Sequence, residues 1–346
     1  HNQMTNCEGR KLGVQLGGLV IAALVVSCSQ PAPPAPTWKV VANISVGQTP
    51  GPVTLGGGWA FVPNMSDGTV TQVDRKTGKI VATIKVADPH VLRAKGCAPD
   101  SVHAYYSGSW GWRLCDTPYA IAWGASHLWA IDNGRPQLVE IDPLTHERVD
   151  DFTLPGTGWD VVVAGTKAFV SGYEADQSFY MVDIPSHQVT TVSDLDEGAA
   201  TMAVDSSGVW IACARARVGH LDLVDPVTGH VTHRYAMEGW STDVAGYGGG
   251  VYVRGSMGGD VSRVNGATGA MEWTHDGPGF IGRQGIDELG VGPDGVWISG
   301  PTTVRMNAQT GTVAEKVGIA STSAAADANE LWLVQVDGVV SELVWK

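Results

Sequence analysis

The chain of 346 residues carries 22 lysines and arginines against 35 aspartates and glutamates, which gives a formal net charge of −13. This acidic balance argues against nucleic acid as a partner, because nucleic-acid binding depends on basic patches that release counterions. The 45 glycines fit a fold with many tight turns. No long amphipathic helical period occurs in the sequence, which argues against a helical partner domain.

The first 28 residues have the pattern of an export signal. Arg10 and Lys11 precede an apolar core, residues 12–26, which is too short for a comfortable membrane span. The segment ends in Val-Val-Ser-Cys at residues 25–28, which resembles the lipobox of bacterial lipoproteins. The resemblance implies that 1–28 is a lipoprotein signal peptide and that Cys28 becomes the lipidated first residue of the mature protein. An ordinary signal peptide is the alternative.

A proline-rich segment, SQPAPPAPT at residues 29–37, follows Cys28. Such segments favour an extended polyproline conformation, so we expect a tether that holds the next domain off the bilayer. Together with the lipobox, the tether predicts an exported protein that is lipid-anchored to the bacterial cell envelope, on its periplasmic or extracellular face. No other stretch is long and apolar enough to span a membrane.

One motif recurs from residue 38 onward. Its clearest copy, residues 56–86, reads GGGWAFVPNMSDGTVTQVDRKTGKIVATIKV: an aromatic strand, a polar loop, an alternating strand ending in Asp, a Thr-Gly turn and a last alternating strand. The strand-ending Asp or Asn recurs about every 41 residues, with one longer interval. We expect the preceding aromatic of each copy to fill the wedge between neighbouring units. The strand-ending residues are Asp74, Asp142, Asp183, Asp225, Asn265 and Asn307, and the aromatics are Trp59, Trp129, Phe169, Trp210, Tyr252 and Trp297.

Repeats of this length, built only from strands and turns, predict an all-β fold, a seven-bladed β-propeller over residues 38–346. The seventh copy, which starts at Glu330, stops after its third strand. Residues 38–46 alternate like the last strand of every copy. We therefore predict that this N-terminal segment completes the last blade and closes the ring, which removes an exposed sheet edge.

The repeats resemble those of the YVTN family of β-propeller proteins. The resemblance rests on VDRKTGKIVATIKV with the preceding GWAFVPNMSDGTV, and on the weaker copies LDLVDPVTGHVTHRY and GVWISGPTTVRMNAQTGTV. It covers nearly all of 38–346 and implies the fold and an extracytoplasmic location. The architecture is also similar to that of the lyases that open streptogramin antibiotics. That similarity implies a His and an acidic residue beside a bound magnesium ion, a motif that does not map onto this chain.

The longer interval holds an insertion, residues 87–117, in which Cys97 and Cys115 are suited to form a disulfide. Such a bond would stabilise the loop by about 3 kcal/mol. We expect a lid or docking loop on the face where loops lead into the innermost strands. The alternative is that its aromatic side chains pack on the rim of the ring; they could also stack on sugar rings. The predicted binding residues are His103, Tyr105, Tyr106, Trp110, Trp112 and Arg113.

Carboxylates recur near the starts of the expected innermost strands, at Asp160, Asp243 and Asp287. Several acids around one axis could hold a calcium or magnesium ion in the central channel. The alternative is that they accept hydrogen bonds from backbone amides of neighbouring blades. No other cofactor is predicted.

Catalytic signatures are absent from the sequence: it has no HExxH, no phosphate-binding Gly-Lys-Ser/Thr loop, no GxSxG and no dinucleotide fingerprint. We therefore expect a non-catalytic monomer that binds an envelope protein, a small molecule or a glycan on the face that bears the insertion. One alternative is a lyase or hydrolase assisted by a divalent metal. Another is a passive envelope scaffold with a plugged channel and no discrete pocket.

Overall fold

The computed structural model describes residues 8–346 except 17–18, 28–36, 89–116, 133, 173–178, 193–194, 196–198, 214–217, 239–240, 256–258, 281–287, 294 and 336. The chain divides into two units, His1–Thr37 together with Lys346, and Trp38–Trp345. The two units are described separately.

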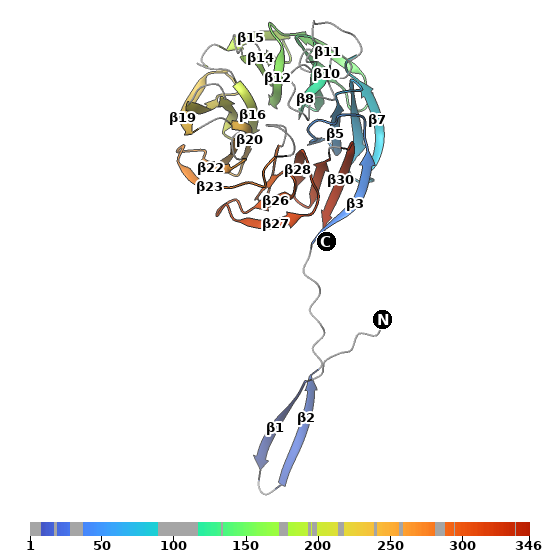
Figure 1. Cartoon of the computed structure of the whole chain (residues 1–346), viewed down its shortest axis with the longest axis vertical. Coiled ribbons are helices and arrows are strands. Elements are labelled where there is room, and N and C mark those ends of the chain that lie inside the picture. Colours follow the sequence, from blue (N-terminus) through green and yellow to red (C-terminus); the bar gives the residue numbers. More distant parts are fainter. Residues whose placement is uncertain are drawn as a thin grey trace. The chain divides into compact units, whose positions relative to one another are not determined.

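The unit Trp38–Trp345 is a seven-bladed β-propeller. Its described strands form seven antiparallel sheets of four strands each, and the sheets follow one another around a central axis (Figure 1). The first strands of successive blades contact one another and form the inner wall of the ring. The predicted fold class is therefore confirmed.

The blades are numbered in chain order. Blade 1 contains β4 (Thr54–Gly56), β5 (Trp59–Asn64), β6 (Thr69–Asp74) and β7 (Lys79–Lys85). Blade 2 contains β8 (Pro118–Gly124), β9 (His127–Asp132), β10 (Gln137–Ile141) and β11 (Arg148–Thr153). Blade 3 contains β12 (Gly158–Ala164), β13 (Lys167–Gly172), β14 (Phe179–Asp183) and β15 (Gln188–Val192).

The remaining blades repeat this order. Blade 4 contains β16 (Ala199–Asp205), β17 (Gly208–Cys213), β18 (Val218–Val224) and β19 (Val231–Glu238). Blade 5 contains β20 (Ser241–Tyr247), β21 (Gly250–Gly255), β22 (Val261–Asn265) and β23 (Met271–His275). Blade 6 contains β24 (Leu289–Gly292), β25 (Gly295–Ile298), β26 (Thr303–Met306) and β27 (Val313–Val317). Blade 7 contains β28 (Ser323–Asp327), β29 (Glu330–Val334), β30 (Val339–Trp345) and β3 (Trp38–Ser45).

The N-terminal strand closes the ring, as predicted. Strand β3 is the outermost strand of blade 7 and pairs antiparallel with β30, from Trp38 opposite Trp345 to Ser45 opposite Val339. Ile44 of β3 is buried in an apolar cluster that also contains Val340 of blade 7 and residues of blade 1. Pairing and packing together join the two ends of the propeller.

The repeat aromatics lie in the wedges between blades; Trp59 packs in the wedge between blades 1 and 2, but Phe61 holds the equivalent strand position there. In the other blades the aromatic faces the residue two positions before the strand-ending Asp or Asn, as Trp129 faces Glu140. In blade 1 that position is held by Phe61, which faces Gln72, whereas Trp59 faces Asp74. Phe61 is fully buried and Trp59 is only partly buried. Two aromatics spaced two apart point to the same side of a strand, so only the strand register distinguishes them.

The turns between third and fourth strands are held by their own side chains. The Asp225 carboxylate accepts hydrogen bonds from the backbone N–H groups of Val227 and Thr228 at 2.9 and 2.7 Å. The next residue, Gly229, has φ of +76°, a left-handed conformation that favours glycine. These contacts give the turns a structural role.

The two faces of the ring carry different connections between strands. Because strand direction alternates, outermost strands end and innermost strands begin on the same face. The segment that joins Lys85 at the end of β7 to Pro118 at the start of β8 connects on this face, which we call the insertion face. The opposite face carries the turns between third and fourth strands, and we call it the turn face. The outermost strands, β3 included, begin at the turn face.

The other unit contains a two-stranded antiparallel hairpin, β1 (Glu8–Leu16) and β2 (Leu19–Ser27). Among the described residues, no helix has the length and apolar character needed to cross a membrane. The predicted lipidation site Cys28 and the predicted disulfide pair Cys97 and Cys115 lie outside the described residues.

Candidate functional site

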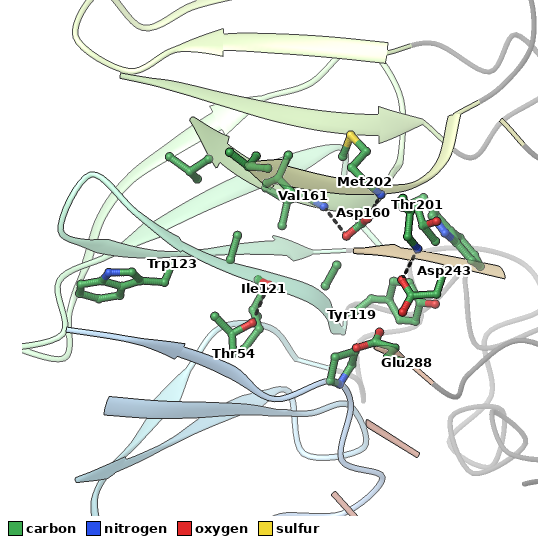
Figure 2. Close-up of a pocket in the computed structure, with 18 of the residues that line it drawn as sticks. Thr54, Tyr119, Ile121, Trp123, Asp160, Val161, Thr201, Met202, Asp243 and Glu288 are labelled. Carbon is green, nitrogen blue, oxygen red and sulfur yellow. Dashed lines mark hydrogen bonds between the residues drawn. The ribbon is translucent and has the colours of Figure 1, made fainter. Parts of the chain in front are cut away.

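A cavity of about 310 Å³ lies among the innermost strands of blades 1 to 6. Aliphatic and aromatic side chains form most of its wall, and polar side chains gather toward the insertion face. Figure 2 shows Asp160, Thr201, Asp243 and Glu288 together at this end, whereas Trp123 lies at the other end. The cavity therefore extends along the channel and has a polar mouth.

The polar mouth is built from one structural position per blade. This position lies nine residues before the buried repeat aromatic, so that Asp160 precedes Phe169 and Thr201 precedes Trp210. The cross-strand registers of the blades agree on this alignment. We call these seven residues the mouth ring. In blade order, they are Pro52, Ala120, Asp160, Thr201, Asp243, Glu288 and Ser323.

Asp160 connects blades 3 and 4. Its Oδ1 accepts a hydrogen bond from the backbone N–H of Val161 at 2.8 Å, and its Oδ2 accepts one from Met202 at 2.7 Å (Figure 2). Desolvation by the surrounding protein raises the pKa of Asp160 from 3.8 to about 7, and repulsion by Asp243 adds to the rise. The amide donors oppose the shift because they favour the ionised form.

Asp243 repeats this arrangement between blades 5 and 6. Its Oδ1 accepts a hydrogen bond from the backbone N–H of Val244 at 2.8 Å, and its Oδ2 accepts one from Leu289 at 2.5 Å. Desolvation raises the pKa of Asp243 from 3.8 to about 7, while the amide donors and the charge of Arg254 act in the opposite direction. Both acids therefore titrate near neutrality and link neighbouring blades.

Arg254 also stabilises the junction between blades 5 and 6. It is fully buried and donates hydrogen bonds to the backbone carbonyls of Ser299 at 3.0 Å and Gly279 at 2.7 Å. Its guanidinium lies 4.4 Å from the centre of the Phe280 ring. These contacts hold blades 5 and 6 together behind Asp243.

The acids do not form a ready metal site. All four carboxylate oxygens of Asp160 and Asp243 accept backbone amides. No three His, Cys, Asp or Glu side chains converge within the part of the chain that the structure describes. The calcium or magnesium ion that the sequence suggested for the channel stays a prediction. Asp287 lies outside the described residues.

Aromatic side chains border the mouth beside the acids. Tyr119 and Trp159 pack with their ring centres 5.0 Å apart, and both line the cavity. Each immediately precedes a mouth-ring residue, in blades 2 and 3. The Oγ1 of Thr201 is buried and has no hydrogen-bond partner among the described residues. The mouth thus combines flat aromatic surface with carboxylate groups within one small space.

The structure brings together only part of the predicted site. Asp160 and Asp243 line the same cavity, while the predicted residues of the insertion lie outside the described residues. Sequence reasoning did not select Tyr119, Trp159 or Thr201. The constant spacing of nine residues to the repeat aromatic identifies Thr201. The predicted residues outside the description are His103, Tyr105, Tyr106, Trp110, Trp112, Arg113 and Asp287.

Comparisons with known proteins confirm the architecture and leave the activity open. No protein-family model matches the chain, and no curated protein matches it. Among solved structures 1236 chains match, so the fold does not discriminate between functions. One of them, hydrazine synthase of Kuenenia stuttgartiensis, has a TM-score of 0.67 and 12% sequence identity, covering 88% of this chain and 97% of that chain. At this identity the likeness shows the propeller fold alone.

Proposed function

We propose that this protein is a lipid-anchored binding protein of the bacterial cell envelope, with propeller repeats of the YVTN type. It takes its ligand at the mouth of the channel on the insertion face and does not catalyse a reaction. The observation that carries the proposal is the cavity of about 310 Å³ with its aromatic and carboxylate mouth. Ligand sites are concave, mostly apolar and supplied with a few polar groups, which matches this arrangement.

The chemistry of the mouth restricts the ligand. Three acids, Asp160, Asp243 and Glu288, line the cavity, and its described lining contains no Lys, Arg or His. A negatively charged group would be repelled there, whereas a neutral or cationic group would be accepted. The small volume suits a small molecule, a sugar unit or one side chain of a partner protein. The insertion 87–117 connects on the same face, which supports a role for its aromatic residues in the same ligand contact.

A blocking variant tests the site. Thr201→Phe places a ring in the mouth, and Thr166→Phe makes the same replacement in an exposed turn between β12 and β13, on the turn face. The parent and both variants are immobilised, used to capture ligand from extracts of the protein's own host, and compared for affinity toward what the parent retains. We expect Thr201→Phe to weaken binding at least about tenfold and Thr166→Phe to leave it unchanged. Equal binding by all three proteins would contradict the proposal.

The lipid anchor has its own test. Cys28→Ala should release the protein from the membrane fraction, because Cys28 is the proposed acyl attachment site. Retention of the variant in washed membranes would refute the anchor and would leave the binding site untouched.

No observation favours the alternative lyase or hydrolase. Such an enzyme needs a His or a carboxylate pair that faces a substrate beside a metal-sized oxygen cage. The described lining includes no His, and the carboxylates of Asp160 and Asp243 already accept backbone amides. The open cavity likewise supports binding over a passive scaffold with a plugged channel.

A further inference from the structure

Within the part of the propeller that the structure describes, exposed large apolar side chains lie on one face. Among the described residues, every large hydrophobic side chain that is exposed lies in a turn of the turn face or at the strand end beside it. Leu144 and Val227 occupy turns between third and fourth strands and are 75% and 72% exposed. The others are Val40, Val41, Ile80, Val81, Val149, Tyr247, Met271 and Val313.

The strongest concentration is on the outermost strands of blades 7 and 1. Each of these strands has, at or next to its first residue, an exposed lysine followed by two exposed aliphatic residues. The register shifts beside Val41 in β3 and beside Val81 in β7, so that each is an extra residue opposite the neighbouring strand. Such a bulge turns two consecutive side chains toward solvent. We call this surface the apolar rim, and it comprises Lys39, Val40, Val41, Lys79, Ile80 and Val81.

The two halves of the apolar rim belong to neighbouring blades. Arg75, in the turn that leads into β7, forms ion pairs with Asp327 at 2.6 Å and Glu330 at 2.9 Å in blade 7. In the interior, Ile44 of β3 and Val73 of blade 1 belong to one buried apolar cluster, which also joins blades 7 and 1. Figure 1 shows β3 and β7 following each other along the same side of the ring. The two halves of the apolar rim therefore lie on neighbouring, directly joined blades.

The same bulge recurs in blades 2, 4, 5 and 6 without a preceding lysine. Blade 4 has Thr232 and blade 5 has Glu272 at the bulged position, and in blade 2 the bulged Val149 is followed by Asp150 and Asp151. Only blades 7 and 1 combine two aliphatic residues with a preceding lysine. On a chain of net charge −13, this local combination of lysine and apolar groups matches an anionic lipid surface.

The tether joins the propeller at the start of β3, one of the two strands of the apolar rim. This connection indicates which surface covers the apolar rim. Residues 29–37 separate Cys28 from Trp38, the first residue of β3. At about 3.1 Å per residue in extended polyproline form, the ten residue steps from Cys28 to Trp38 span about 31 Å. This length sets the greatest separation between the lipid and the start of β3 and allows closer approach. A lipid on Cys28 thus keeps the apolar rim within about 31 Å of the bilayer and lets it reach the surface.

We propose that the apolar rim rests on the phospholipid bilayer that holds the anchor, with its aliphatic side chains in the headgroup layer and its lysines beside anionic headgroups. This inference rests on the proposed lipid anchor. Contact on this side presents the turn face to the membrane. The opposite insertion face, with the channel mouth, is then directed away from the membrane toward its ligand.

The test separates rim contact from the anchor by using the full chain with Cys28→Ala. This protein and a second carrying V40S, V41S, I80S and V81S in addition are sedimented with vesicles of phosphatidylethanolamine and phosphatidylglycerol at a ratio of about 3:1. We expect the four added substitutions to lower the vesicle-bound fraction at least about tenfold. The matched control adds T190S and T191S, which alter two exposed residues on the outermost strand of blade 3, and should bind like the Cys28→Ala parent.

Each outcome decides a separate claim. Equal vesicle binding by all three proteins, or no binding by the Cys28→Ala parent, would overturn the apolar rim as a lipid contact while leaving the anchor standing. Sedimentation without vesicles shows whether the four substitutions change the oligomeric state, which would assign the surface to a second copy and also overturn the proposal. Unchanged urea unfolding verifies that the variants fold.

Discussion

The two buried acids of the mouth ring predict an unusual dependence of stability on pH. Their pKa values rise from 3.8 to about 7 in the folded protein, chiefly through desolvation. Between these two values the folded state binds more protons than the unfolded state, so folding loses stability as pH rises. The full contribution is present below pH 4 and is lost once pH passes about 7. Most paired carboxylates give the opposite trend.

The size of the effect follows from the shifts. One pKa unit corresponds to about 1.4 kcal/mol, so a rise from 3.8 to about 7 corresponds to at most about 4 kcal/mol per group. Both side chains border a cavity that water reaches, which reduces the observable loss between pH 5 and pH 8 to about 1–2 kcal/mol per carboxylate. The double variant Asp160→Asn/Asp243→Asn removes both titrations and should flatten this part of the profile.

Urea unfolding at pH 5 and pH 8 measures the difference. At pH 5 the double variant should be less stable than the parent, by about 1–3 kcal/mol for each backbone amide that loses its acceptor. Its unfolding free energy should nevertheless change less between pH 5 and pH 8 than that of the parent. Asp183→Asn is the matched control, because the pKa of Asp183 is lowered to about 2 by Ser186 and Lys167 and its carboxylate is ionised throughout this range. A double variant with the parent's pH dependence, or a parent that gains stability toward pH 8, would refute the reasoning.

Two further predictions concern the closure and the insertion. Ile44→Ala should lower the free energy of unfolding by about 2–4 kcal/mol because it opens a cavity at the junction of blades 7 and 1. The control Val41→Ala, on the same strand, should lower it by less than about 0.5 kcal/mol. Similar losses for both variants would argue against the closing strand. Reduction of the proposed Cys97–Cys115 bond should speed proteolysis within 87–117 and leave the unfolding midpoint of the ring unchanged. First cleavage elsewhere would contradict the disulfide.

The fold could be predicted from the sequence because its signals are local. Strand alternation, Asp-x-x-Thr-Gly turns and a regular period specify each blade without knowledge of distant contacts. The closing strand was predictable because the seventh copy lacks its fourth strand while residues 38–46 have that strand's pattern. Trp59 was selected in blade 1 although Phe61 holds the equivalent position, because Phe61 has the same aromatic character on the same side of the strand, and the choice depends on cross-strand register.

The site was only partly predictable because its members come from different blades. Asp160 and Asp243 were found from their acidic character at the starts of innermost strands. Thr201 carries no such chemical signal, and its place in the mouth ring depends on an alignment through the buried aromatics. Tyr119 and Trp159 precede ring positions in successive blades, and their 5.0 Å contact exists only once those blades pack side by side.

We propose that ligand binding and membrane contact take place on opposite faces of one ring. Hydrogen exchange of the protein with its proposed lipid anchor in membranes, with and without the captured ligand, tests this division directly. We expect slow exchange at residues 39–41 and 79–81 in both conditions, and slower exchange at residues 117–121 only when ligand is added. Ligand-dependent protection on the turn face, or membrane protection of the insertion face, would contradict the account.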